Sequence, residues 1–372
     1  MDEVDWSQRL IGIKGCREIG KTTFLLSYAR EYFAPDGREC LYVNLNNFIF
    51  TERTLTDFAG EFYAAGGKVL LIDQIFKYPN WSRELRYCYD HYTNLRIVFT
   101  GSSVMRIKEE NHEVGDIVAP YYLRGFSFRE YLNLKTGLDL QPFSFDMLMR
   151  DRDIIARDII AQVNPGEYFH DYLHHGFYPF FLEKRNYSEN LLKMMNMTLE
   201  VDVLYIRQIE QRYLPKLRRL LYLISQNEPC TLNISQLSKD IGTSRATVMN
   251  YLKYLKDARM ITLLYPRGEE FPQKPVYAYL YNPNLLHVMN RQTQDERTVN
   301  EAFFFNQLLK DNRVNAYDRH NSFLVNDRYL FRISYPEARW KVSPDFYYAV
   351  DEVEPPLDEP NCIPLWMFGF LY

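Results

Sequence analysis

The stretch that decides the fold of this chain is LIGIKGCREIGKTTFLLSYAREYF, residues 10–33. Its opening, LIGIK, is an apolar run rich in isoleucine and predicts a buried strand. The segment TTFLLSYAREYF (22–33) predicts a helix, because its apolar residues recur at helical spacing. Between the two lies GCREIGKT (15–22), which matches the phosphate-binding pattern G-x-x-x-x-G-K-[ST] in the required setting of strand, loop and helix.

The composition of this loop suits a triphosphate for direct physical reasons. Glycines let the backbone curl so that successive N–H groups point inward, and the helix N-terminus adds partial positive charge there. Lys21 is placed to reach the β- and γ-phosphates, and Thr22 to offer its hydroxyl to Mg²⁺. A loop that matches the pattern and binds nothing is the alternative. We predict nucleotide contacts from Gly15, Cys16, Arg17, Glu18, Ile19, Gly20, Lys21, Thr22 and Thr23.

A second part of the predicted site ends the strand KVLLID (68–73), which we expect to lie beside the first strand. A carboxylate at Asp73 would hold Mg²⁺, directly or through a water, although capping of the next turn is the alternative. The following residue is Gln74, where many ATPases of this layout carry a glutamate. An amide orients a water but accepts no proton, so slow hydrolysis by Lys21, Asp73 and Gln74 and binding without turnover both stay open.

The rest of the first third alternates strands and helices, with further strands predicted at 40–45, 95–101 and 121–126. This alternation predicts an α/β domain with a parallel sheet covered on both faces. Thr100 and Ser102, in FTGSS at the end of the fourth strand, are candidate sensors of the γ-phosphate. Ordinary turn chemistry is the alternative explanation for them.

Bulk composition narrows the class of protein. A length of 372 residues predicts two or three domains, and a net charge of −4 argues against a chain that is basic overall and coats nucleic acid. The five cysteines are widely spaced, which argues against a disulfide framework or a zinc knuckle. The N-terminus has no signal-peptide pattern, and the apolar run IPLWMFGFLY is too short to span a bilayer. We expect a soluble, cytoplasmic protein that does not contact a membrane.

A helix-turn-helix pattern follows a helical region in the second half of the chain. The segment TSRATVMNYLKYLKDARMI spaces Val248, Tyr251, Leu252 and Leu255 on one buried face, with Ser244 or Thr243 as the cap. A β-hairpin wing is expected after it. The outward residues are candidates for contact with duplex DNA in a major groove, or the element serves as a structural lid or protein contact. These outward residues are Arg245, Thr247, Asn250 and Lys253.

Four motifs together resemble a prokaryotic family of AAA-type ATPases: GCREIGKTT, LLIDQIFKYPNW, RIVFTGSS and YYLRGFSFREYL. The resemblance extends through YLHHGFYPFFLE and RTVNEAFFFNQLL to nearly the whole chain. It implies a five-stranded, parallel P-loop domain over 1–138, a helical lid or linker over 139–228, a winged helix over 229–282, and a small α+β nuclease-like domain over 283–372.

Two departures of the sequence from that family concern catalysis. Gln74 stands where the family has glutamate, and Gly115-Asp116 stands where it has Gly-Arg, whose arginine is a candidate trans-acting finger. Arg106 and Arg124 lie nearby but off register. An absent arginine removes a factor of roughly 10³ or more from phosphoryl transfer.

The nuclease-like segment lacks a complete catalytic set. Glu301 on a helix and Asp345 at the start of the strand DFYYAV are the carboxylates that such a nuclease would use, but Lys341 is poorly placed to join them. We expect an inactive scaffold with Glu301 at a solvated position; a nuclease controlled by ATP is the weaker alternative.

The sequence therefore predicts a protein that binds ATP with Mg²⁺, hydrolyses it slowly and acts as a nucleotide-governed switch. Its candidate partners are a nucleotide, a protein partner or further copies of this chain, and duplex DNA at the winged helix, where a structural or protein-contact role is the alternative. The alternative is a DNA-binding regulator that binds ATP without turnover.

Overall fold

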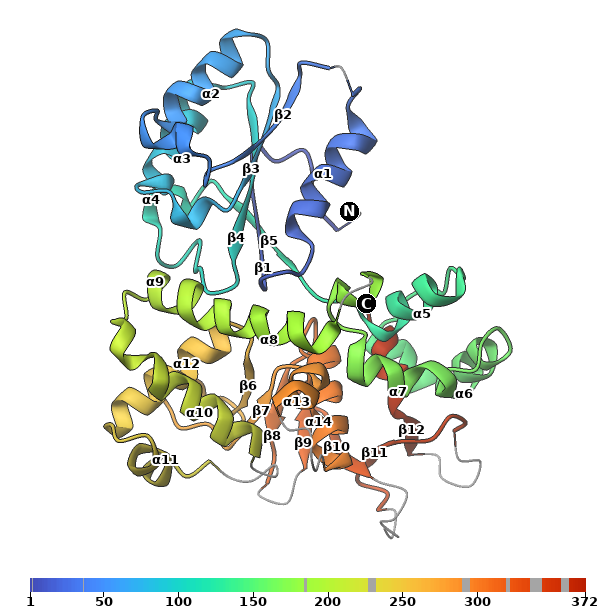
Figure 1. The fold of residues 1–372 in the computed structure, drawn as a ribbon. Coiled ribbons are helices and arrows are strands. Elements are labelled where there is room, and N and C mark those ends of the chain that lie inside the picture. The colour runs from blue at the N-terminus through green and yellow to red at the C-terminus, as the bar shows by residue number, and fades with distance from the viewer. Residues whose placement is uncertain are drawn as a thin grey trace. The chain divides into compact units, whose positions relative to one another are not determined.

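The computed structural model describes residues 1, 3–35, 37–183, 186–226, 232–289, 295–318, 322–334, 343–355 and 361–372 (Figure 1). These residues form two compact units. The first unit contains Met1–Arg124 and Val201–Gln208, and the second contains Gly125–Glu200 and Ile209–Tyr372. The predicted boundary between 228 and 229 lies outside the described residues, and the four-part division stays a prediction.

The first unit is an α/β layer structure, as predicted. Its strands are β1 Leu10–Gly15, β2 Cys40–Asn44, β3 Val69–Asp73, β4 Arg96–Ser102 and β5 Ala119–Leu123. They form one parallel sheet in the order β2-β3-β4-β1-β5. Its helices are α1 Lys21–Tyr32, α2 Leu55–Ala64, α3 Trp81–His91, α4 His112–Gly115 and α9 Leu204–Ile206, with 3₁₀ turns at Phe48–Thr51 and Ile75–Lys77. Figure 1 shows α1 on one side of the sheet and α2, α3 and α4 on the other.

Alternation along the strands supplies each face of the sheet with its own apolar cluster. In β1, Ile11 and Ile13 join Leu25 and Tyr28 of α1 in one cluster, whereas Leu10 joins the cluster formed with α2 and α3. Successive side chains of a strand point to opposite faces. This sheet therefore needs helices on both sides, and the strands read as apolar runs because both faces are buried.

One prediction about the sheet is wrong. We expected β3 to lie beside β1, but β4 lies between them and pairs with both strands. The sequence pattern gave no basis for the order, because β3 and β4 are both buried apolar strands. The carboxyl ends of parallel strands still meet at one edge of the sheet, so Asp73 remains at the same edge as Gly15.

The second unit is mostly helical at first and then mixed. Its helices are α5 Phe128–Thr136, α6 Phe145–Ile160, α7 Gly166–His175, α8 Tyr187–Met197, α10 Leu214–Gln226, α11 Ile234–Asp240, α12 Arg245–Asp257, α13 Pro283–Met289 and α14 Glu296–Leu308. Short 3₁₀ helices occur at Pro179–Leu182, Gln211–Tyr213 and Leu365–Phe370. A π-helical turn, Thr198–Val203, continues α8 across the boundary between the two units.

The strands of the second unit form two sheets. The strands are β6 Ile261–Leu264, β7 Tyr277–Leu280, β8 Val314–Ala316, β9 Phe323–Val325, β10 Tyr329–Ser334, β11 Tyr347–Val350 and β12 Cys362–Pro364. β6 and β7 pair antiparallel, and the other five form a mixed sheet in the order β12-β11-β10-β9-β8. The expected hairpin after α12 is confirmed by the β6–β7 pair.

Capping side chains begin α5 and α12 in the second unit, and the cap of α12 is the one that the sequence predicts. Ser127 and Glu130 form a capping box at the start of α5. Ser244 caps α12 by accepting a hydrogen bond from the backbone N–H of Thr247. The buried face of α12 is also as predicted: Val248, Tyr251, Leu252 and Leu255.

Two expectations about the C-terminal segment are wrong. Asp345 is exposed and lies in a turn before β11, which begins at Tyr347, because the strand pairing with β10 starts there. Glu301 is fully buried rather than solvated, because α14 is enclosed on almost every side. Lys341 lies outside the described residues.

Within the residues that the structure describes, no helix combines the length and the apolar character needed to cross a lipid bilayer.

Candidate nucleotide-binding site

The loop between β1 and α1 has the backbone shape that its glycines permit. Gly20 has φ 96°, in the left-handed region that favours glycine, and it directly precedes α1. A Cβ at Gly15 would lie 2.6 Å from the carbonyl oxygen of Leu123 on β5, so only glycine fits this close approach. The two glycines of the motif thus fix how the loop leaves the sheet and how it enters the helix.

Lys21, the first residue of α1, folds its side chain back over the loop. Its Nζ donates to the carbonyl oxygens of Gly15, at 3.1 Å, and Cys16, at 2.6 Å. Burial lowers the pKa of Lys21, and the nearby carboxylates of Asp73 and Asp202 act in the opposite direction. Carbonyl oxygens are neutral acceptors, so phosphate oxygens that reach this ammonium would bind it more strongly.

Asp73 is the centre of the hydrogen-bond network at the carboxyl edge of the sheet. Its side chain is 2% exposed and accepts hydrogen bonds from the hydroxyls of Thr22 (2.7 Å), Tyr42 (2.9 Å) and Thr100. Burial, reinforced by the negative charge of Asp73, raises the pKa of Tyr42 to about 12. Thr22 and Asp73, the two residues predicted to bind Mg²⁺, are therefore hydrogen-bonded to each other.

This donor set fits a magnesium ion. Magnesium is usually held in such sites by one or two carboxylates together with substrate phosphates and waters. Thr22 directs its proton to Asp73, which leaves lone pairs of its oxygen available to a cation. Tyr42 was missed by the sequence analysis, because nothing in the run CLYVN marks one aromatic hydroxyl as part of a site 31 residues away.

Gln74 adopts a left-handed backbone conformation with φ 60° directly after β3. Its N–H donates to Thr100 Oγ1 at 3.0 Å, and its carboxamide oxygen accepts from Asn46 Nδ2 at 2.7 Å. Thr100 therefore orients both Asp73 and Gln74. The contacts made by Thr100 explain why a hydroxyl stands there without requiring that it senses a phosphate, and the sensing role stays a prediction.

Ser102, the last residue of β4, makes a different contact. Its Oγ donates to Asp202 Oδ2 at 2.9 Å, and Arg17 Nη2 of the loop donates to Asp202 Oδ1 at 2.5 Å. Asp202 lies in the π-helical turn and is 3% exposed. Sequence analysis missed it. The available signal in the sequence was an acidic residue between the apolar Val201 and Val203, in TLEVDVLYI (198–206).

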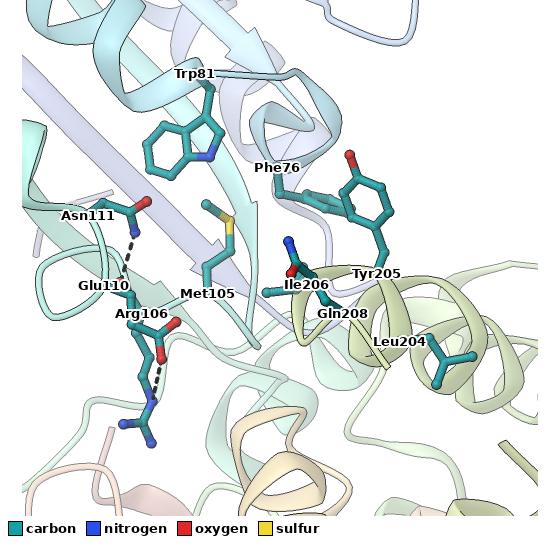
Figure 2. Close-up of a pocket in the computed structure, with 10 residues that line it drawn as sticks. All are labelled: Phe76, Trp81, Met105, Arg106, Glu110, Asn111, Leu204, Tyr205, Ile206 and Gln208. Carbon is teal, nitrogen blue, oxygen red and sulfur yellow. Dashed lines mark hydrogen bonds and ion pairs between the residues drawn. The ribbon is translucent and has the colours of Figure 1, made fainter. Parts of the chain in front are cut away.

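A cavity of about 570 Å³ lies in the first unit, beside the loop that follows β4 (Figure 2). Aromatic and apolar side chains surround it together with a few polar ones. Figure 2 shows Tyr205, Ile206 and Gln208 near Phe76, with Trp81 and Met105 also at the cavity. The lining residues are Phe76, Trp81, Met105, Arg106, Glu110, Asn111, Leu204, Tyr205, Ile206 and Gln208.

Asp116 and Arg106, the residues at and near the position of the family's arginine, each pair with another side chain of the first unit. Asp116, at the position where the family has arginine, accepts hydrogen bonds from Arg86 at 3.0 Å. Arg106 forms an ion pair with Glu110 at 3.8 Å and lines the cavity. Arg17, by contrast, lies within the phosphate loop itself.

The candidate DNA-contacting residues of α12 divide into two pairs. Arg245 and Asn250 are exposed, whereas Thr247 and Lys253 are half-buried. Thr247 Oγ1 lies 2.9 Å from Ser244 Oγ, and Lys253 Nζ lies 4.6 Å from the ring centroid of Phe271. The latter two side chains thus already have partners within the second unit.

The carboxylates considered for a nuclease are not assembled into a site. Glu301 Oε1 accepts from Arg297 Nε at 3.0 Å, and this arginine lies on the same helix. Burial raises the pKa of Glu301 to about 7, more than Arg297 lowers it. Asp345 lies on an exposed turn.

Comparison with known proteins matches two parts of the chain to protein families. Residues 7–132 match the model of an AAA domain, and residues 166–296 match a domain of unknown function, DUF8612. The second match begins within the predicted helical lid and ends just after the predicted winged helix. The family's description names neither a lid nor a winged helix.

Two curated relatives come from Methanocaldococcus jannaschii, and both are uncharacterised. MJ1637 is 24% identical over 277 residues, which cover 70% of this chain and 58% of that protein. MJ1544 is 25% identical over 270 residues, which cover 68% of this chain and 55% of that protein. The chain thus spans little more than half the length of these relatives.

Two solved structures are distant matches. Domain III of the Thermotoga maritima replication initiation protein DnaA has 16% identity and a TM-score of 0.26, over 50% of this chain and 82% of that one. PCH-2 of C. elegans has 14% identity and a TM-score of 0.25, and the match covers 67% of this chain and 60% of that one. Scores this low carry no functional argument. The family match over residues 7–132 and the five-stranded parallel sheet together support the assignment of this part of the chain to the AAA type of P-loop domain.

Proposed function

We propose that this protein binds ATP with Mg²⁺ at the loop 15–22 and hydrolyses it slowly, as a nucleotide-governed switch. The observation that carries the proposal is the hydrogen bond between Thr22 and Asp73, which joins the phosphate loop to the end of β3. A chance match to the loop pattern gives no reason for a buried carboxylate at hydrogen-bond distance from this threonine. The AAA-domain match over residues 7–132 supports the same conclusion.

Each residue of the site has a distinct task in this proposal. The loop amides and the start of α1 bind phosphate oxygens, and Lys21 turns from the carbonyls of Gly15 and Cys16 to the terminal phosphates. Thr22 and Asp73 would hold Mg²⁺, which would supply positive charge to the phosphate oxygens. Tyr42 and Thr100 keep Asp73 in place by donating hydrogen bonds to it.

Slow turnover follows from the residue at position 74. The Gln74 carboxamide orients a water by hydrogen bonding but does not take its proton, so the general-base contribution of roughly 10²–10⁴-fold is missing. Asn46 Nδ2 donates a hydrogen bond to the oxygen of this carboxamide and so restricts its orientation. Slow hydrolysis is typical of a switch, whose bound state must persist long enough to be recognised by a partner.

The test is release of inorganic phosphate from Mg-ATP and from Mg-GTP, with the Lys21→Ala variant as the control. We expect slow release with ATP and none above background in the variant. Binding is measured separately by calorimetry, so that a protein that binds without turnover is recognised. Absence of binding heat with both nucleotides would remove the proposal, whereas binding without phosphate release would leave the non-hydrolysing alternative.

A second candidate function is contact with duplex DNA through α12, favoured by the exposure of Arg245 and Asn250 on this capped helix. Fluorescence anisotropy with labelled duplex at 50 and 200 mM salt tests it, because phosphate contacts weaken as salt rises. Arg245→Ala is expected to reduce affinity, whereas Lys253→Ala is the comparison, since Lys253 already packs on Phe271. Equal affinity of wild type and Arg245→Ala would exclude this surface.

A further inference from the structure

The segment 201–208 joins the first unit from far along the chain. Residues 187–200 of the same helical run belong to the second unit, so the chain passes from one unit to the other within continuous helix. Two side chains anchor the segment to the first unit. Asp202 binds Arg17 and Ser102, and Arg207 donates to Glu110 at 2.7 Å and to the carbonyl oxygen of Val104 at 2.9 Å.

The Asp202 contact occupies two side chains that the sequence predicts to meet the nucleotide. Arg17 lies in the phosphate loop, and Ser102 ends β4 directly opposite Gly15 in the strand register. Each oxygen of the Asp202 carboxylate binds one of the two side chains. The negative charge of Asp202 also acts on Lys21, whose pKa it shifts upward against the effect of burial. A carboxylate of this chain therefore sits among the cations and hydroxyls of the phosphate loop.

The Arg17 guanidinium has unused capacity for a phosphate. Its Nε is buried and has no hydrogen-bond partner among the described residues, although its Nη2 binds Asp202. A guanidinium is a planar group with several donors, matched to two oxygens of a phosphate. An arginine within the loop can also stabilise charge during phosphoryl transfer, which Asp116 cannot do in the place of the family's arginine.

We propose that Asp202 competes inside the protein with the terminal phosphate of a nucleoside triphosphate for Arg17 and Ser102. This inference rests on nucleotide binding at the loop 15–22. Arrival of the γ-phosphate releases the carboxylate, frees Arg17 for the reaction, and shifts segment 201–208. A diphosphate lacks the group that competes with Asp202, so it leaves the contact closed.

The surroundings of the segment allow it to move. The cavity of about 570 Å³ is lined on one side by Leu204, Tyr205, Ile206 and Gln208, so the segment has open space next to it (Figure 2). Tyr205 is 56% exposed, which leaves its ring unconfined on that side. The Arg207–Glu110 pair lies at the other end and keeps the segment attached when Asp202 is released. The triphosphate would thus change the position of one helical turn.

The experiment compares Mg-ATP and Mg-ADP affinities by calorimetry in wild type, Asp202→Asn and Glu110→Gln. Asparagine keeps the shape of Asp202 and removes its charge. Because the competing carboxylate is gone, Asp202→Asn should bind Mg-ATP about tenfold more tightly than wild type. Its affinity for Mg-ADP should change little. Glu110→Gln is the matched control, because it removes one charge from the other anchor of the same segment without touching Arg17. It should leave both affinities unchanged.

Other results have distinct meanings. If wild type binds neither nucleotide, the proposed function fails before the inference is reached. If wild type binds Mg-ATP and Asp202→Asn binds it equally or more weakly, the competition does not exist. Should Asp202→Asn fold poorly by circular dichroism, hydrogen exchange of wild type decides: amides of 201–208 should exchange faster with Mg-ATP than with Mg-ADP, and equal exchange overturns the proposal.

Discussion

Single residues at the carboxyl edge of the sheet decide what the nucleotide site can do. Asp73 is held by hydroxyl donors from the helix α1 and the strands β2 and β4, so its position depends on three separate elements. Gln74 follows it in a left-handed conformation that aims the residue away from the strand direction. In the proposed site, Gln74 is the one residue beside Asp73 that stands where a carboxylate would accept a proton.

Restoring a carboxylate at this position should speed hydrolysis. Gln74→Glu has nearly the same size and supplies a base for the attacking water, so phosphate release should rise by roughly 10²-fold. The measurement is phosphate release at saturating Mg-ATP. Gln74→Leu is the control, because it keeps the bulk but neither orients a water nor takes a proton. Turnover by Gln74→Glu no faster than wild type would show that position 74 does not limit the reaction.

Glu301 makes the stability of the protein depend on pH. Burial raises its pKa from 4.5 to about 7, so the folded protein binds this proton more tightly than the unfolded chain does. The stabilisation is complete below pH 4.5 and is lost as the pH rises through 7. Relative to Glu301→Gln, which does not titrate, wild type should lose about 3 kcal/mol of unfolding free energy between these limits.

Urea unfolding of both proteins at pH 5 and pH 8 checks this expectation. The difference between wild type and Glu301→Gln isolates the one carboxyl, because all other titrating groups are shared. A difference that stays constant with pH would mean that Arg297 keeps Glu301 ionised throughout, contrary to the effect of burial.

At the scale of elements, serine side chains cap the starts of α5 and α6, and one of these serines is buried whereas the other is exposed. Ser127 is fully buried: its Oγ accepts from the N–H of Glu130 at 3.2 Å and donates to the carbonyl oxygen of Tyr372 at 2.9 Å. Ser144 caps α6 in the same way through the N–H of Met147, but it is exposed. The same residue type thus has a long-range contact at one cap and a local one at the other.

Alanine at the two caps should separate these contributions. Ser144→Ala loses one cap bond and is expected to cost about 1 kcal/mol of unfolding free energy. Ser127→Ala loses the capping box and the Tyr372 contact, so about 2 kcal/mol is expected. Urea unfolding at pH 7 measures both. Equal losses would show that the contact between α5 and the last residue contributes nothing to stability.

At the scale of the whole molecule, nucleotide binding should stabilise the first unit more than the second. The loop 15–22, Asp73 and segment 201–208 all belong to the first unit. A ligand present at one hundred times its dissociation constant stabilises the state that binds it by about 2.7 kcal/mol. Slower hydrogen exchange with Mg-ADP is therefore expected first in peptides from β1, α1 and β3.

Hydrogen exchange with mass spectrometry, with and without Mg-ADP, makes this measurement peptide by peptide. The diphosphate is used here so that release of segment 201–208 does not oppose the effect. Lys21→Ala should show no protection at the same nucleotide concentration. Protection confined to peptides of the second unit would place the nucleotide elsewhere and contradict the assignment of the loop.

Much of the first unit was predictable because the signals were local. The loop 15–22 needs glycine where φ is positive and where β5 approaches, and the apolar runs needed strands buried on both faces. Capping at Ser244 was predictable for the same reason, since donor and acceptor lie three residues apart. The order of β1, β3 and β4 was not, because similar apolar strands can exchange places without changing any local pattern.

The sequence by itself determined the phosphate loop, the alternating elements of an α/β domain and the carboxylate at position 73. Tertiary structure alone decided that Tyr42 and Thr100 hold Asp73, that Glu301 is buried, and that Asp202 binds Arg17 from 185 residues away in the chain. The reason is physical: spacing along the chain fixes turns, caps and the faces of elements. Contacts between distant segments depend instead on which buried surfaces pack together, and no short stretch of sequence encodes that choice.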